Sequence, residues 1–151
     1  MLFRSVEGDV QVLRPEAESW EEGLLNLPIR QGYILSTGLG RAEIEFESGA
    51  TARLAERTTL QFVELALSDG ARITRLSLQQ GTATFYANLS RHDVFVVATP
   101  DLEAVVPDNS RFRMDVLTSG TTLTVMKGDL DVNSASGSYR LGKGQIGRAH
   151  V

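Results

Sequence analysis

The stretch Gly32–Leu60 has the sequence GYILSTGLGRAEIEFESGATARLAERTTL. Within it, Ala42, Ile44 and Phe46 alternate with glutamates, and strict alternation is typical of a β-strand with one buried face and one solvated face. A Ser-Gly turn then leads into a second alternating run that starts at Thr51. We therefore predict a β-hairpin whose glutamates lie on the solvated face.

The hydrophobic pattern also predicts the register of this hairpin. If residues 48–50 form the loop, Ile44 lies opposite Leu54 and Glu45 lies opposite Arg53, so that each face keeps one chemical character. A two-residue loop would set Ile44 against Arg53 and mix the two faces. We therefore predict the three-residue loop and the Ile44–Leu54 pair.

The chain has 151 residues, which is enough for one domain with a sizeable core. Hydrophobic residues make up 42% and charged residues 23%, as in a globular domain rather than a disordered chain. The formal net charge of −4 argues against a nucleic-acid partner, because such partners select basic surfaces. No apolar run approaches the roughly 20 residues that span a bilayer, and the lack of cysteine excludes disulfides and thiolate metal sites.

Both ends of the chain resemble translated sequencing adapters. Met1–Ser5 is what GTG-CTC-TTC-CGA-TCT encodes when GTG initiates, and residues 145–151 are what CAG-ATC-GGA-AGA-GCA-CAC-GTC encodes. We therefore expect the native domain to occupy residues 6–145, with non-native segments at 1–5 and 146–151, as in a metagenomic fragment. On this expectation the chain says nothing about a signal peptide or membrane helix of the full-length protein.

Short alternating segments separated by Gly, Ser, Asn and Asp recur along the chain and predict strands. Besides the hairpin, they are 9–13, 33–35, 58–63, 73–79, 82–87, 93–98, 102–106, 111–117, 121–127, 130–133 and 139–141. We predict an all-β fold of about 10 to 13 short strands in two packed antiparallel sheets, as a β-sandwich or a flattened barrel. The one helix candidate is Pro15–Leu25, where Trp20 and Leu24 have helical spacing, although Gly23 fits a loop with one helical turn equally well.

Two patterns concern the interior of this predicted fold. Val94–Val97 is continuously apolar, which predicts a central strand covered on both faces. Phe85 and Tyr86 are neighbours within an alternating run, so one of the two rings must face outward.

The sequence also contains internal echoes in which a glycine or a threonine is followed by an alternating run. We interpret Gly81 and Gly128 as turns between strands, and the echoes together as two similar β-units packed face to face. The offsets within the pairs are unequal, which argues against a regular solenoid. The echoes are Leu76–Phe85 with Leu123–Val132, and Thr37–Ile44 with Thr99–Val106, while Gly8–Val12 resembles the second half of the first pair.

Histidines give little support for catalysis or metal binding. His92 and Asp93 could form half of an acid–base pair, but the start of a solvated strand explains them as well. Because His150 lies in the adapter-like end, one native histidine remains, which is too few for a His-rich metal site.

Carboxylates are the other candidate chemistry. Glu43, Glu45 and Glu47 could serve a carboxylate-based hydrolase, since paired carboxylates cleave glycosides. Consecutive outward positions opposite an arginine are, however, typical of a solvated face with a cross-strand ion pair. We therefore predict a protein that is not an enzyme, with no catalytic, cofactor-binding or metal-binding residues, and keep the hydrolase as a remote alternative.

A series of strand-and-turn motifs runs along almost the whole chain. The motifs are Gly8-Asp-Val10-x-Val12, Trp20, Gly32-Tyr-Ile34-x-x-Thr37, Arg41-Ala-Glu43-Ile44, Ser48-Gly49-x-x-x-Arg53-Leu54, Thr58-x-Leu60, Leu76-x-Leu78-x-x-Gly81, Val94-x-Val96-x-Ala98-Thr99-Pro100, Phe112-x-Met114-x-Val116, Thr124-Val125-x-x-Gly128-x-Leu130-x-Val132 and Leu141-x-x-Gly144-Gln145. Their order and spacing resemble the FecR-like domain family, the extracytoplasmic module of ferric-citrate-type regulators and of other bacterial surface proteins.

The resemblance implies an all-β domain of the periplasm or cell surface that takes part in signal transduction by protein binding. In the regulators, such a domain reads a TonB-dependent outer-membrane receptor and controls an anti-sigma segment across the inner membrane. The resemblance also implies a protein partner, such as a receptor or regulator, and it supplies no catalytic residues or cofactor. Strand addition at an exposed sheet edge is one physical route to such binding. The alternative is a structural cell-envelope module without a signalling role.

Overall fold

Strands account for all the regular structure in the computed structural model, which describes residues 1–150. Within those residues the strands are β1 (Leu2–Glu7), β2 (Gln11–Leu13), β3 (Glu21–Glu22), β4 (Ile34–Ser36), β5 (Arg41–Glu45), β6 (Thr51–Leu54), β7 (Thr59–Ser68), β8 (Ala71–Ala87), β9 (Val94–Ala98), β10 (Leu102–Val105), β11 (Ser110–Leu117), β12 (Gly120–Lys127), β13 (Leu130–Ser134), β14 (Gly137–Leu141) and β15 (Ile146–His150). The all-β class is confirmed. The strands are more numerous than predicted because β1, β3 and β15 lie where no strand was expected.

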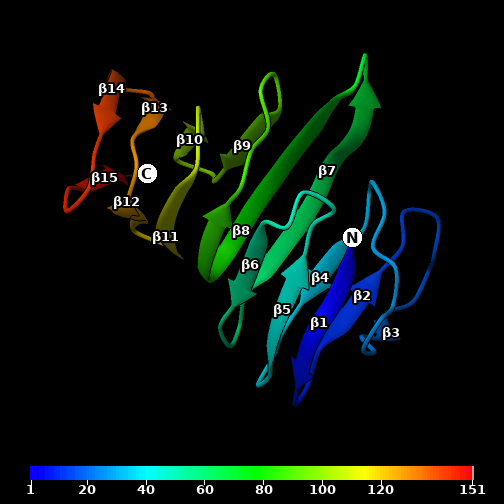
Figure 1. Ribbon diagram of the computed structural model, residues 1–151. Coiled ribbons are helices and arrows are strands. Elements are labelled where there is room, and N and C mark those ends of the chain that lie inside the picture. Colours follow the sequence, from blue (N-terminus) through cyan, green and yellow to red (C-terminus); the bar gives the residue numbers. More distant parts are fainter. Residues whose placement is uncertain (151) are drawn as a thin grey trace.

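The strands form two sheets that share β8. The first, sheet A, has the order β1-β5-β6-β8-β11-β12-β15. The second, sheet B, has the order β14-β13-β10-β9-β8-β7-β4-β2-β3. Figure 1 shows β1 to β5 on one side of the long β7–β8 pair and β9 to β15 on the other. Among the described strands, β8 and β9 run parallel and every other pair is antiparallel, so the predicted antiparallel sandwich contains one parallel pair.

The strand β8 crosses from one sheet to the other at Gly81. Residues 71–80 pair with β7 in sheet B, and residues 81–87 pair with β11 in sheet A. Gly81 has a φ of +92°, and a Cβ placed there would lie 2.5 Å from the Cα of Thr58. Only glycine meets both requirements, a left-handed backbone and contact with a neighbouring main chain.

Two fully buried threonines hold this crossing point together. Thr37 Oγ1 accepts a hydrogen bond from Thr58 N at 3.0 Å and donates one to Ala55 O at 2.6 Å. Thr58 Oγ1 in turn accepts from Thr82 N at 3.0 Å and lies 3.1 Å from Thr82 O, to which it can donate. The hydroxyls thus provide hydrogen-bond partners for main-chain groups that have none in the strand ladders where β8 passes from one sheet to the other.

The internal echoes are sheet crossings and turns rather than two similar β-units. The interpretation of Gly81 as a turn between strands is wrong, because β8 continues through it. Gly128 connects β12 of sheet A with β13 of sheet B, and Gly8 likewise connects β1 with β2. Thr37 lies between β4 and β5, which belong to different sheets, whereas Thr99 lies in the β9–β10 hairpin within sheet B. The shared pattern therefore marks places where the chain crosses between the sheets or turns back within one.

The predicted hairpin exists as β5 and β6, but its register is shifted by two residues. Ile44 lies opposite Ala52 and Glu43 opposite Arg53, so the predicted pairs Ile44–Leu54 and Glu45–Arg53 are wrong. The loop is residues 47–49, closed by Phe46 N donating to Ala50 O at 2.9 Å. Its third residue is Gly49 with a φ of +88°, the left-handed position that three-residue hairpin loops reserve for glycine. A shift of two keeps each side chain on its predicted face.

The core lies between the two sheets and confirms most of the inward positions. Val96 and Val97 are both buried on β9, which confirms a central strand covered on both faces. Phe85 is fully buried, whereas Tyr86 faces outward between two arginines. The alternation of β8 thus decides which neighbour enters the core.

The segment 15–25 contains no helix within the described part of the chain. Trp20 and Leu24 are 41% and 54% exposed, so the helical spacing buries no apolar stripe. Instead, Glu21 and Glu22 form β3 against β2, and Gly23 N donates to Val10 O at 2.7 Å. No helix among residues 1–150 is long and apolar enough to cross a membrane.

Candidate functional site

The glutamates of β5 form an ion-paired surface. Glu43 is half-buried and accepts a 2.9 Å hydrogen bond from Arg53 Nε, with Arg4 Nε at 3.8 Å. The Glu43 carboxylate raises the pKa of the Arg53 guanidinium above its ordinary value, chiefly through this hydrogen bond. Glu45 and Glu47 are exposed. The arrangement matches a solvated strand face rather than two carboxylates directed at one substrate.

His92 and Asp93 lie in the connection between β8 and β9 and make separate contacts. His92 is exposed and has a φ of +74°. Asp93 Oδ1 accepts from Arg72 N at 2.9 Å, and Asp93 Oδ2 accepts from Ser90 N at 2.9 Å. The bond from Arg72 N is the main reason why the pKa of Asp93 lies below its usual range, with a smaller contribution from Ser90 N. Asp93 therefore anchors its loop to β8 as an ionised carboxylate.

Replacing Asp93 by alanine is expected to lower the free energy of unfolding by about 1 to 2 kcal/mol, since two amides lose an ionised acceptor. The wild-type advantage is full above the aspartate pKa of the unfolded chain, about 3.9, and disappears as the pH falls through the lower folded pKa. Urea denaturation of both proteins between neutral and acidic pH measures the difference. A difference that does not change with pH would contradict the assignment.

A hollow lined by several apolar side chains lies at one end of the sandwich, between the sheets. It has a volume of about 450 Å³. Phe46 of the β5–β6 hairpin and Phe95 of β9 meet there edge to face, with ring centroids 5.8 Å apart. Leu65 and Leu67 of β7 and Ile73 of β8 also line the hollow. We call this hollow the cleft.

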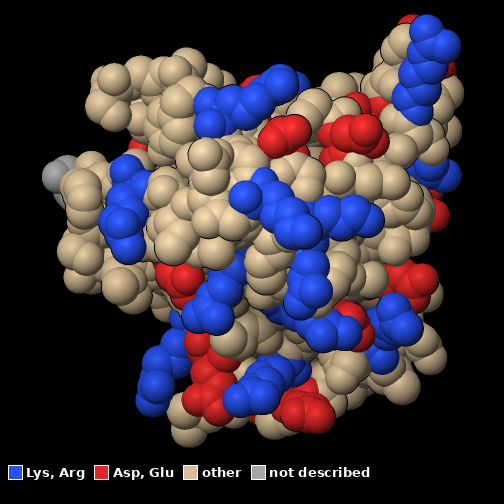
Figure 2. Space-filling model, turned by 60° about the vertical axis from the view of Figure 1, so that its left-hand side comes forward, with Lys and Arg blue, Asp and Glu red and all other residues tan. Residues whose placement is uncertain are grey.

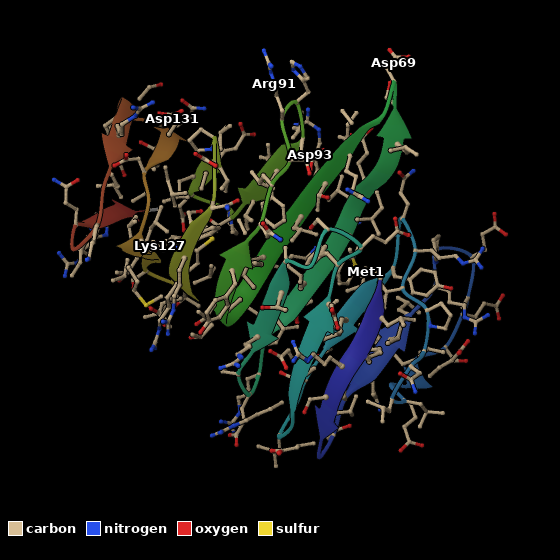
Figure 3. All side chains as sticks on the ribbon, in the orientation of Figure 1. Met1, Asp69, Arg91, Asp93, Lys127 and Asp131 are labelled. Atoms are coloured by element: carbon tan, nitrogen blue, oxygen red, sulfur yellow. The ribbon has the colours of Figure 1, made fainter. Side chains whose placement is uncertain are left out.

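The cleft is bordered by the projecting end of the β7–β8 pair, residues 64–73, which we call the arm. Figure 1 shows that the arm extends beyond the other strands, and in Figure 2 it stands out at the upper right. Asp69 and Gly70 form its tip, with Ser68 paired to Ala71. In Figure 3, Asp93 and Met1, which both line the cleft, lie on the two sides of the β7–β8 pair.

A β-bulge between Phe62 and Glu64 sets the direction of the arm side chains. Phe62 lies opposite Leu76, and after the register shift Leu65 lies opposite Thr74. Thr74 and Leu76 share one face of β8, so Leu65 shares the inner face with Phe62 despite an odd spacing. The same parity places Leu67, which is 73% exposed, on the side of the cleft.

The arm was not predicted, because the expected strands ended at Val63 and restarted at Ile73. Asp69-Gly70 between alternating apolar residues is a strong signal for a two-residue hairpin turn, and it would have joined the two strands. The change from Leu60 and Phe62 to Leu65 and Leu67 is the corresponding signal for a bulge.

The outer face of sheet A carries a second group of functional residue types. Tyr86 lies between Arg111 and Arg53, whose guanidinium carbons are 4.8 Å and 5.4 Å from the ring centroid. A shallow hollow of about 510 Å³ lies on this face, bordered by Thr82 and Arg113 among others. Figure 2 shows Lys and Arg side chains in several separate groups with Asp and Glu between them, so no field of one sign covers this view.

No group of three or more His, Cys, Asp or Glu side chains within residues 1–150 has the geometry of a metal site.

The fold matches two crystal structures of a putative anti-sigma factor from Parabacteroides distasonis ATCC 8503, at 1.65 Å and 2.50 Å resolution. Each match has a TM-score of 0.62 and 17% sequence identity, and covers 78% of this chain and 59% of the other. This chain therefore spans less than two thirds of that protein. No curated protein sequence matches it.

The family model described as FecR protein matches residues 33–131. This range runs from the start of β4 into β13 and so includes the crossing point at Gly81, the arm and most of the core. This match covers more than half of the chain, and the chain belongs to the FecR protein family.

Proposed function

We propose that this domain is a non-enzymatic, extracytoplasmic sensor and protein-interaction module that passes a signal to a transmembrane regulator. The observation that carries the proposal is the FecR match over residues 33–131. The putative anti-sigma factor with the same fold supports a role in regulation.

The contacts of the candidate catalytic residues support a role without catalysis. Glu43 is bound by arginine, and both oxygens of Asp93 accept main-chain hydrogen bonds. The cleft and the arm offer apolar surface for contact, from Leu65, Leu67 and Phe95 among others. Apolar side chains beside a cleft suit the binding of a protein.

The full-length gene tests the proposal most directly. We expect the DNA before this domain to encode a membrane helix, preceded by a cytoplasmic segment able to bind a sigma factor. In cells, protease added outside the inner membrane should cleave the full-length protein within this domain. A gene that instead joins the domain to a signal peptide and to peptidoglycan-binding or repeat domains would favour a structural cell-envelope role and contradict the proposal.

We also propose that the native domain comprises residues 6–145. The codon match at both ends supports this, and the affected strands, β1 and β15, occupy the two outer edges of sheet A. Phe3 of β1 is fully buried, so the native protein must fill that space with residues of its own. Resequencing the source locus is the test, and native DNA that encodes residues 1–5 or 146–151 would overturn the proposal.

A further inference from the structure

Within residues 1–150, no strand pairs with the outer edge of the arm. The strand β4 pairs with β7 as far as Gln61, and Phe62 still bonds to the loop before β4. Among the described residues, the hydrogen bond to this edge beyond Phe62 comes from a side chain: Leu65 N donates to Gln31 Oε1 at 3.1 Å. Strand edges of this kind pair readily with another extended chain.

The direction of the Leu65 amide identifies which other groups face this edge. In an antiparallel pair, alternate residues direct their N–H and C=O groups toward the partner strand and away from it. Leu65 N faces away from β8, so the N–H and C=O of Leu67 do so as well. Arg72, opposite Leu67, likewise directs its N–H away from the ladder, to Asp93. Leu67 therefore offers a free donor and acceptor beside the cleft.

The same stretch offers apolar contacts and positive charge. The side chain of Leu67 is 73% exposed, and the cleft next to it contains the Phe46–Phe95 pair. Arg30 and Arg72 line the cleft, and neither forms an ion pair within the part of the chain that the structure describes. Two carboxylates line the cleft, those of Asp93 and Glu47. Asp93 accepts hydrogen bonds from main-chain amides, and Glu47 lies in the β5–β6 loop.

We propose that an extended segment of a partner protein adds to the arm as a strand along residues 64–68, with alternate apolar side chains in the cleft and an acidic side chain near Arg72 and Arg30. A free N–H and C=O call for a peptide main chain, which a lipid cannot supply. The two arginines favour a carboxylate in that segment. This inference rests on the proposed interaction role and assigns a surface to it.

The test uses a short blocked peptide of alternating valine and threonine that ends in aspartate, added to the isotope-labelled chain. We expect the Leu67 amide to exchange rapidly in the free protein and to become protected on peptide binding. Leu67→Pro removes the outward N–H but no hydrogen bond of the β7–β8 ladder, so the variant should keep the fold. Its dissociation constant should rise roughly tenfold or more, while that of Leu67→Val should stay within about threefold of wild type.

Two controls separate this mode of binding from others. Leu117, which is 66% exposed on β11, is a matched exposed leucine, and Leu117→Ala should leave peptide binding unchanged. Dodecanoate, which is apolar and acidic but lacks a peptide main chain, should compete poorly. The inference is overturned if Leu67→Pro binds the peptide as tightly as wild type, or if dodecanoate binds and the peptide does not. Protection of the Leu67 amide in wild type decides the matter even if the proline variant fails to fold.

Self-association is the remaining outcome. Protection of the Leu67 amide that rises with protein concentration, without peptide, would mean that the arm pairs with a second copy and would overturn the proposal of a different partner. A full-length gene of regulator type together with a negative peptide result would leave the proposed function standing and reject this surface alone.

Discussion

Replacing Gly81 by alanine is expected to lower the free energy of unfolding by about 3 to 5 kcal/mol. A Cβ at this position would overlap Thr58 Oγ1 and lie 2.5 Å from Thr58 Cα and 2.6 Å from Arg57 O. Two of these three atoms belong to the main chain, so a side-chain rotation cannot relieve the contact. The φ of +92° adds the ordinary cost of a left-handed conformation for a residue with a Cβ.

Gly144→Ala is the matched control, because Gly144 has a φ of +81° and no atom lies within 4 Å of the place that a Cβ would take. It should cost about 1 to 2 kcal/mol, the conformational penalty alone. Urea or thermal denaturation measures both variants against the wild type. If the two alanine variants lose equal stability, close approach of Thr58 to β8 is not what requires glycine at position 81.

Replacing Phe85 by alanine is expected to cost about 3 to 5 kcal/mol, because it empties a space in the centre of the core. Phe85 is fully buried on the part of β8 that belongs to sheet A. Its ring stacks on Phe112, with centroids 5.2 Å apart and an angle of 26° between the planes. The loss therefore includes both the buried area of the ring and its contact with Phe112.

The neighbouring residue provides the control for this prediction. Tyr86→Ala removes a ring of similar size that faces outward between Arg53 and Arg111, and should cost about 1 kcal/mol. Denaturant midpoints of the two variants under identical conditions give the comparison. A Tyr86→Ala variant less stable than Phe85→Ala would show that the outer face of sheet A contributes more than the core position beside it.

The period-2 pattern predicted which side chains enter the core but not how the strands pair. In the β5–β6 hairpin, registers that differ by two residues bury the same positions, so hydrophobicity cannot separate them. The loop decides, since Gly49 takes the left-handed third position and moves Arg53 opposite Glu43. The need for glycine at the left-handed third position of the loop therefore selects the observed register.

The path of β8 and the cleft could not be predicted from the hydrophobic pattern, for a different reason. Gly81 has the local signature of a turn, and its role as a crossing point depends on Thr58, which comes close only in the folded chain. The cleft likewise combines the β5–β6 loop, the arm and the start of β9, segments far apart in sequence. By contrast, the expectation that a glutamate of β5 pairs with an arginine needed only the neighbouring strand, and the identity of the arginine was correct.

The strand β8 pairs with β6 and β11 in sheet A and with β7 and β9 in sheet B, so it is an interior strand of both sheets. Loss of β8 would therefore disrupt both sheets. The two layers should therefore melt in one cooperative transition, with hydrogen-exchange protection lost from both together. A proteolytic cut within β8 would dismantle both layers at once. We therefore expect no internal boundary at which the domain could be divided into halves that fold on their own.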